Sequence, residues 1–221
     1  MAGESPEVGY TTFGPIFNLP CAISADNKDA IIERMTVVLE HARGQKINLT
    51  WARLSETFSE IRGPEGTSEV GKNQPAIALK VGTLVLAEKI IGFNDSAFQT
   101  EVRSLTAVAV DRYAFLRGST QTAGADLVSS KEFADLIGLW ERHFPWQEGV
   151  YSAVLQIHIV GVAHPTEFVL AFALSSSDVK LLRDNLPDVA RYERELVIPP
   201  EGAQKYNWRW VYPRFVRPAA R

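Results

Sequence analysis

Residues 150–175 read VYSAVLQIHIVGVAHPTEFVLAFALS, and this stretch carries the clearest structural signal in the chain. Apolar and polar positions largely alternate up to Ile159, with Gln156 and His158 on the polar side. After a break at 163–167 a second alternating run follows. Alternation of this kind places one face of each run in a core, so the stretch predicts an antiparallel β-hairpin.

The rest of the chain is predicted from the same periodicities. Apolar residues recur at helical spacing in segments 27–43, 49–62 and 130–143, which are predicted to be helices. Segment 104–117 is predicted to be a strand, and 76–93 begins like a strand but could turn helical near residue 88. The remaining predictions are a loop over 63–75, a loop over 118–124, and a helix capped by Ser177-Asp178 and ending near Pro187. The rest of the chain is predicted to be irregular or to contain a short strand around 208–212.

These elements lack a strict strand–helix–strand rhythm. The sequence therefore predicts an α+β fold in which an antiparallel or mixed β-sheet packs against three to four helices. We divide the chain into an extended N-terminal arm (1–26), a single α+β domain (27–202) and a basic aromatic C-terminal segment (203–221). Pro15 and Pro20 argue against a central strand in the arm.

The composition is that of an ordinary globular protein. The chain has 221 residues, of which 46% are hydrophobic and 22% charged, and its net charge is −3. Cys21 is its single cysteine, which excludes an internal disulfide or a cysteine-based metal centre and favours a reducing compartment. Neither a signal peptide nor an apolar run of membrane-spanning length is visible, so we expect an intracellular, cytoplasmic protein.

No motif in the chain assembles a recognisable catalytic centre. The glycine-rich phosphate loops are absent. Ser177-x-x-Lys180 matches part of a serine–lysine hydrolase pattern, but Ser177 stands where a helix cap belongs. His158 and His164 flank the hairpin turn, where surface positions are more common than a metal or acid–base pair. We therefore predict no catalytic residue, metal ligand or cofactor, and keep a small histidine-dependent enzyme as an alternative.

The most unusual composition is that of the C-terminal segment, where basic and aromatic residues interleave. Such side chains can bind phosphates and stack on bases, or lie at a lipid headgroup layer. Equally, the rings can pack on the core of a terminal strand while the arginines reach solvent. The candidate residues for binding nucleic acid or lipid are Lys205, Trp208, Arg209, Trp210, Arg214 and Arg217.

The N-terminal arm suggests a different role. Tyr10, Phe13 and Phe17 are apolar residues of an extended segment, and exposed arms of that kind commonly pack on a neighbouring copy. The leading hypothesis is a non-enzymatic structural protein that self-associates. A nucleic-acid-binding protein that uses the C-terminal segment is the alternative from another class.

The run HFPWQEGVY at 143–151, followed by the alternating LQIHI at 155–159, resembles the central part of rhabdovirus matrix proteins. The order of an extended N-terminal segment before two apolar stretches is also similar. This resemblance implies a virion structural protein in the host cytoplasm that self-associates, contacts the nucleocapsid and meets the inner face of an anionic membrane. Because residues 1–26 carry no Lys or Arg, attraction to the membrane would come from the C-terminal segment.

Overall fold

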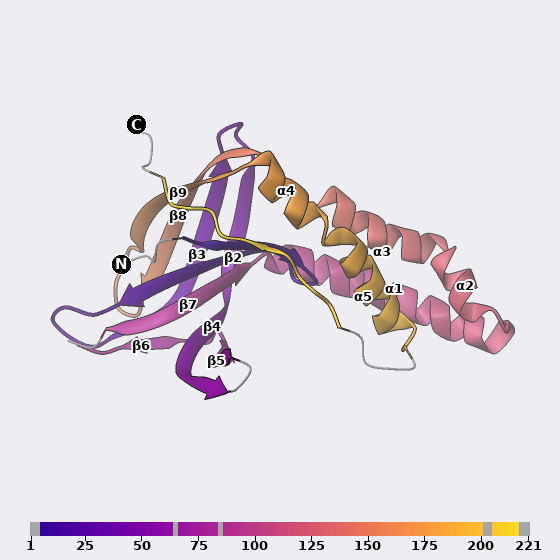
Figure 1. The fold of residues 1–221 in the computed structure, drawn as a ribbon, viewed down its shortest axis with the longest axis horizontal. Helices are drawn as coiled ribbons and strands as arrows, with labels where there is room; N and C mark the ends of the chain where they lie inside the picture. Colours follow the sequence, from indigo (N-terminus) through magenta and orange to yellow (C-terminus); the bar gives the residue numbers. More distant parts are fainter. Residues whose placement is uncertain (1–4, 64–65, 84–85, 201–204, 217–221) are drawn as a thin grey trace.

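Ten strands pair into one sheet in the computed structural model, which describes residues 5–63, 66–83, 86–200 and 205–216. The strand order is β10-β1-β2-β7-β4-β3-β8-β9, with β5 paired to β4 and β6 paired to β3. All of these strand pairs are antiparallel. The sheet curls, and the helices extend from one of its ends (Figure 1). The predicted α+β fold with an antiparallel sheet is therefore confirmed, whereas the described residues form five helices in place of the three to four expected.

The elements have the following bounds. The strands are β1 (Glu7–Thr11), β2 (Gly14–Ile23), β3 (Ala30–His41), β4 (Lys46–Gly63), β5 (Gly66–Pro75), β6 (Leu79–Val81), β7 (Ala87–Asn94), β8 (Gly149–Ile159), β9 (Thr166–Leu174) and β10 (Trp210–Val211). The helices are α1 (Ser96–Ser119), α2 (Ala123–Val128), α3 (Lys131–Arg142), α4 (Ser176–Arg183) and α5 (Leu186–Val197).

The predicted hairpin is confirmed as β8 and β9, whose register runs without interruption from Gly149–Leu174 to Ile157–Thr166. Its inward face supplies large side chains to the core inside the curl. Phe172 stacks on Tyr151 of the neighbouring strand, with ring centroids 5.2 Å apart. Phe172 also stacks on Phe17 of β2 at 5.6 Å, so rings from distant parts of the sheet meet in its interior.

Two predicted helices are wrong, because segments 27–43 and 49–62 fall mainly within strands β3 and β4. Each strand contains a bulge, between Ile32 and Arg34 in β3 and between Trp51 and Arg53 in β4. A bulge inserts one extra residue, so apolar positions that would be two apart become three apart and imitate helical spacing. The loop predicted over 63–75 is also wrong, because 66–75 form β5.

The N-terminal arm forms β1 and β2 inside the sheet, so the expectation that its prolines exclude a central strand is wrong. β2 lies between β1 and β7. Its pairing with β1 ends at Asn18, whereas its pairing with β7 continues to Ile23. Pro20 therefore lies where β2 has one of these two neighbours, and a missing N–H is tolerated on the other side.

The strand predicted over 104–117 is wrong, because these residues belong to helix α1. The side chain of Asp95 accepts a hydrogen bond from Phe98 N and caps this helix. The predicted helix at 130–143 is confirmed as α3, capped by Ser130. In α4 the cap is Ser175 rather than Ser177, and Asp178 completes a capping box.

The sequence analysis did not predict helix α5, because it placed the end of helical structure near Pro187. That proline instead lies in the first turn of α5, where its missing N–H costs no helical hydrogen bond. Helices α1, α3 and α5 pack on one another and bury Leu136, Leu139 and Val189. No helix within the described residues combines the length and apolar character that a membrane crossing requires.

Candidate functional site

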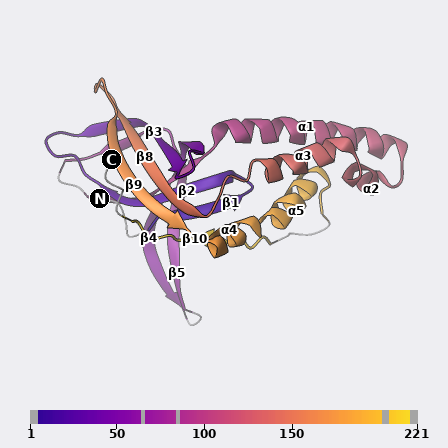
Figure 2. The same ribbon diagram turned by 90° about the horizontal axis from the view of Figure 1, so that it is seen from above.

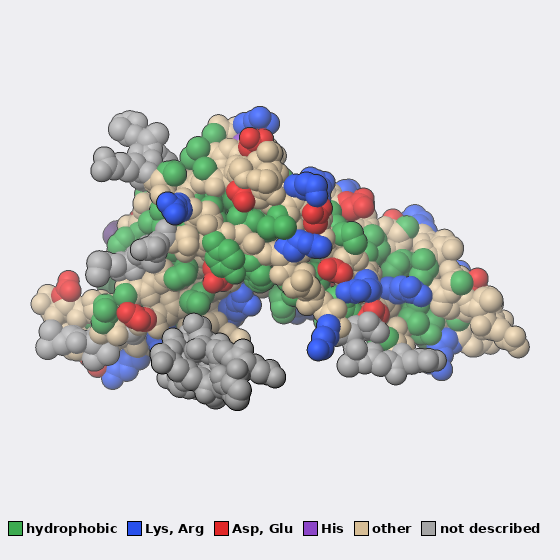
Figure 3. Space-filling view, in the orientation of Figure 1, with side chains coloured by type: hydrophobic (Ala, Val, Ile, Leu, Met, Phe, Trp, Pro, Cys, Tyr) green, Lys and Arg blue, Asp and Glu red, His purple; other side chains and the backbone are tan. Residues whose placement is uncertain are grey.

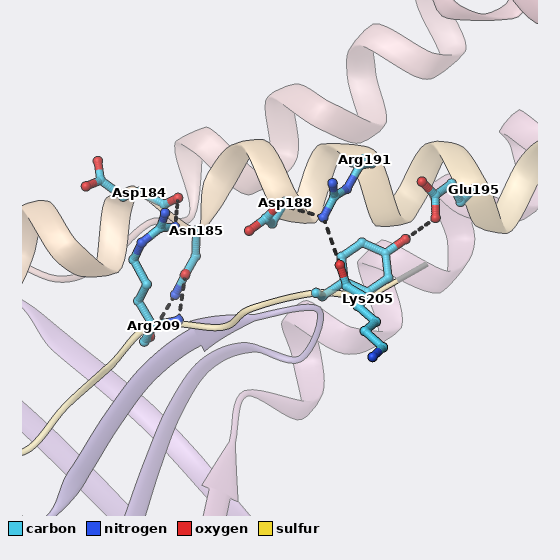
Figure 4. A network of polar contacts seen from close by, with 8 residues as sticks. Asp184, Asn185, Asp188, Arg191, Glu195, Lys205 and Arg209 are labelled. Atoms are coloured by element: carbon cyan, nitrogen blue, oxygen red, sulfur yellow. Dashed lines mark hydrogen bonds and ion pairs between the residues drawn. The ribbon is translucent and has the colours of Figure 1, made fainter. Parts of the chain in front are cut away.

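The C-terminal segment, residues 205–216, is bound to the body of its own chain. Nδ2 of Asn185 donates hydrogen bonds to the carbonyl oxygens of Tyr10 and Arg209, at 3.0 and 2.9 Å. In return, the backbone N–H of Arg209 donates to Oδ1 of Asn185 at 2.9 Å. The guanidinium of Arg209 donates to the carbonyl oxygen of Asp184 at 2.7 Å (Figure 4). These contacts fasten the segment to the junction of α4 and α5.

Aromatic rings of the same segment are engaged within the molecule. Tyr206 stacks on Trp208, with ring centroids 5.6 Å apart and planes inclined by 12°. The guanidinium of Arg191 lies 4.9 Å from the centre of the Tyr206 ring, and the Tyr206 hydroxyl donates to the carboxylate of Glu195. Trp208 also packs against the hydrophobic core. These rings therefore do not form a free platform for stacked bases.

The segment also connects the two ends of the strand order. Strand β10 pairs with β1, and further along the chain Phe215 forms an antiparallel bridge with Phe172 of β9. Val216 N then donates to the carbonyl oxygen of Ala171 at 2.8 Å. The last described residues of the chain thus connect β1 to β9 near Phe172, and they close the curled sheet on itself there.

Beyond that bridge, residues 166–170 of β9 have a strand partner on one side only within the described part of the chain. Strand β9 is the last strand in the strand order and runs beside β8 (Figure 2). Because the carbonyl of Ala171 points outward and strand geometry repeats every two residues, the backbone groups of Val169 and Glu167 point outward too. The side chains of Phe168 and Val169 are each 49% exposed.

Apart from the charge of Glu167, β9 itself contains none of the usual features that protect a sheet edge. Its sequence, TEFVLAFAL, contains no proline or lysine, and its register with β8 contains no bulge. These are the usual devices by which natural sheets prevent pairing between edges. A cavity of about 240 Å³ lies beside the edge and is apolar in character; it is lined by Leu19, Cys21, Ala22, Ile23, Ser24, Ile91, Leu155, Ile157, Phe168 and Leu170. The open part of β9 is therefore a candidate surface for strand addition.

The structure separates the three residues predicted for self-association. Tyr10 and Phe17 are fully buried in the core of their own chain, and the Tyr10 hydroxyl donates to the carbonyl oxygen of Trp140. Phe13, at the turn between β1 and β2, is 51% exposed. Only Phe13 of the three is available to a second molecule in this structure.

The six residues predicted to bind nucleic acid or lipid differ in their exposure to solvent. Lys205, Arg209 and Arg214 are exposed, whereas Trp208 and Trp210 are half-buried against the molecule. Arg217 lies outside the described residues. Figure 3 shows Lys and Arg side chains interspersed with Asp and Glu over α4 and α5, so this face carries charges of both signs.

The structure places His158 and His164 in different surroundings. His158 lies on β8, where its Nε2 is 3.2 Å from Nη2 of the Arg34 guanidinium. His164 is exposed in the turn. No group of three or more His, Cys, Asp or Glu side chains that could hold a metal ion occurs within the described ranges. A cationic neighbour of His158 would also oppose the approach of a metal cation.

Ser177 and Lys180 do not form the hydrolase pair that their spacing matches. Lys180 Nζ pairs with the carboxylate of Asp184 at 2.9 Å, and the Ser177 hydroxyl contacts that of Ser175 at 2.8 Å. Cys21 is half-buried, and burial raises the pKa of its thiol to about 11. A thiol with that pKa is a poor nucleophile near neutral pH.

The chain matches no family model, and neither the curated proteins nor the solved structures contain a match to it. The candidate surface therefore stands on the geometry of β9. Sequence reasoning found the strand but missed its open edge. The absence of proline and lysine from residues 166–174 was the available signal.

Proposed function

We propose that this protein is a non-enzymatic structural protein whose copies associate by strand addition along the open edge of β9. The observation that carries this proposal is the edge over 166–170, which has a strand partner on one side only among the described residues, with two half-exposed apolar side chains and outward-facing backbone groups. Strand addition supplies main-chain hydrogen bonds, and the apolar side chains add buried area.

A second copy of the same chain suits this edge because antiparallel pairing of identical strands is compatible with a two-fold axis. Glu167 is the one charged residue in 166–170. An axis through Phe168 would place Glu167 opposite Val169 of the second copy, so the two carboxylates would not face each other. Like charges directly opposite each other would weaken such a pair.

The matrix-like role implied by the sequence resemblance is an extension of this proposal. In that role the exposed Lys205, Arg209 and Arg214 would contact the phosphates of RNA or of an anionic membrane. Because Tyr206 and Trp208 are stacked on each other, such contacts would be mainly electrostatic and would weaken with added salt.

The test measures molar mass against protein concentration by sedimentation and light scattering. We expect the wild-type mass to rise toward that of a dimer, and Val169→Glu to remain monomeric because its carboxylate faces Glu167 of the second copy. Val150→Glu is the matched control, since Val150 is 48% exposed on β8, outside the proposed contact. A wild-type protein that stays monomeric at high concentration, or a Val169→Glu variant that associates like wild type, would refute the proposal.

A further inference from the structure

A row of four residues crosses the sheet at one level, on strands β1, β2, β7 and β4. Glu7 pairs with Asn18, Asn18 with Gly92, and Gly92 with Arg53. Direct cross-strand partners share a face of the sheet, so the three side chains and the glycine lie in line on one surface.

The glycine allows the arginine to lie flat along this row. A Cβ atom at Gly92 would stand 2.5 Å from Cγ and 2.6 Å from Nε of Arg53, closer than such atoms approach. Arg53 reaches over Gly92 and donates from Nη2 to Oδ1 of Asn18 at 3.1 Å. Nδ2 of Asn18 in turn donates to the carboxylate of Glu7 at 2.9 Å.

Arg53 lacks a direct carboxylate partner among the described residues, because the Asn18 amide stands between it and Glu7. A guanidinium carries five N–H donors, and the one hydrogen bond that Arg53 donates to a described side chain uses one of them. Arg53 is half-buried, and burial lowers the pKa of its guanidinium while the Glu7 charge opposes that shift. The remaining donors of this half-buried guanidinium can therefore pair with an anion that reaches the site.

Arg53 lines a cavity of about 320 Å³ on the same face. Its lining is mainly apolar and includes Phe13 and Ile16, and Asn73 and Asn94 also line it. A concave, largely apolar pocket of this size with a few convergent polar groups is typical of small-molecule sites. Ile16 is 3% exposed, so its side chain is packed in place beneath the cavity.

We propose that this cavity binds a small organic monocarboxylate, with the carboxylate paired to Arg53 and an apolar body against Phe13 and Ile16. The planar fork of a guanidinium matches the two oxygens of a carboxylate. An apolar lining with a single cation is a poor environment for a doubly charged phosphate, because desolvating the second charge would not be compensated. This inference is independent of the β9 edge.

The experiment titrates the full-length protein with 4-phenylbutyrate by calorimetry and ligand-observed NMR. The neutral 4-phenylbutyramide and inorganic phosphate serve as comparison probes. We expect the carboxylate to bind more tightly than the amide, and phosphate to bind undetectably. Millimolar phenylbutyrate that produces no signal, or phosphate that binds in its place, would overturn the proposal.

Arg53→Met keeps the apolar stem and removes the charge. Because the variant removes a charge-assisted hydrogen bond, we expect it to weaken carboxylate binding by about 10–100-fold. The affinity for the amide should not change. Arg34→Met is the matched control, since Arg34 is an exposed arginine on β3 outside this cavity. Equal carboxylate affinity in Arg53→Met and wild type would exclude the assigned role.

A second variant keeps the test decisive if Arg53→Met does not fold. Phe13→Ser alters an exposed turn residue that lines the cavity, so its effect on the fold should be small. We expect it to weaken the binding of carboxylate and amide alike, because it removes part of the apolar wall. Unchanged affinity for both probes would place the ligand elsewhere.

Discussion

Asn185 and Arg209 exchange two hydrogen bonds, so the Asn185 amide pairs with the backbone of Arg209 as a neighbouring strand would. Asn185 is completely buried, at the start of α5. The same side chain donates to the carbonyl oxygen of Tyr10 in β1. One amide thus joins a helix terminus, the first strand and the closing C-terminal segment.

Replacing Asn185 with alanine should destabilise the protein by about 2–4 kcal/mol, because buried backbone groups of Tyr10 and Arg209 would lose their partners. Urea denaturation followed by tryptophan fluorescence measures this change. Asn207→Ala is the control, since Asn207 is an exposed asparagine of the same segment. Its effect should stay within about 0.5 kcal/mol. Equal stabilities of the two variants would contradict the proposed role of the Asn185 hydrogen bonds.

Gly9→Ala should destabilise the protein by about 1–3 kcal/mol through overpacking. An added Cβ would lie 2.5 Å from Cζ3 of Trp210, the cross-strand partner of Gly9. In a Trp210→Ala background the same glycine substitution should cost much less, and a double-mutant cycle measures the difference. Gly118→Ala, where open space surrounds the site in α1, should be neutral or stabilising. Additive effects of Gly9→Ala and Trp210→Ala would refute the contact.

The protein should lose stability as the pH rises through the titration of Glu193. Burial raises the pKa of this carboxyl from 4.5 to about 7, and its hydrogen bond from Thr106 opposes the shift only in part. Between these two values the folded state holds a proton that the unfolded state has released. The free energy of unfolding therefore falls with pH in this window and levels off above about pH 7.

Glu193→Gln should remove this pH dependence and stabilise the protein at pH 8 by on the order of 2–3 kcal/mol relative to wild type. At pH 4 the two proteins should be similar, because wild-type Glu193 is then protonated in both states. Denaturation curves at pH 4, 6 and 8 provide the measurement. Glu141→Gln, an exposed position on α3, is the control. Parallel pH profiles for wild type and Glu193→Gln would show that this carboxyl does not titrate as inferred.

Cys21 should react slowly with iodoacetamide. A pKa of about 11 instead of 9.0 leaves about 100-fold less thiolate at pH 8, and the thiolate is the reactive form. The folded protein should therefore be alkylated about 100-fold more slowly than the same protein in guanidinium chloride. Equal rates would show that the thiol is exposed and ordinary.

Where the sequence signal is local, it predicted the structure. The β8–β9 hairpin contains no bulge, so alternation survives along both strands. Helix α3 carries its cap at Ser130 and buries Phe133 and Leu136 three residues apart on one face. In both cases the residues that create the pattern are also the residues that pack.

Elsewhere local patterns were misleading for identifiable reasons. In β3 the bulge after Ile32 sets the next buried residue, Met35, three positions on. In α1 Val108 and Val110 alternate with small residues like a strand, yet both are exposed. The buried positions Val102, Ala109 and Leu116 recur every seven residues, as two helical turns require.

The sequence by itself determined the class of fold, the β8–β9 hairpin, the lack of an internal disulfide and the unusual composition of the C-terminal segment. Tertiary structure alone decided that this segment closes the sheet, that part of β9 has a partner on one side only among the described residues, and that Arg53 meets Asn18 across Gly92. The physical reason is distance along the chain. Strand neighbours and pocket walls come from residues far apart in sequence, and the bulges that set their register leave no local signal.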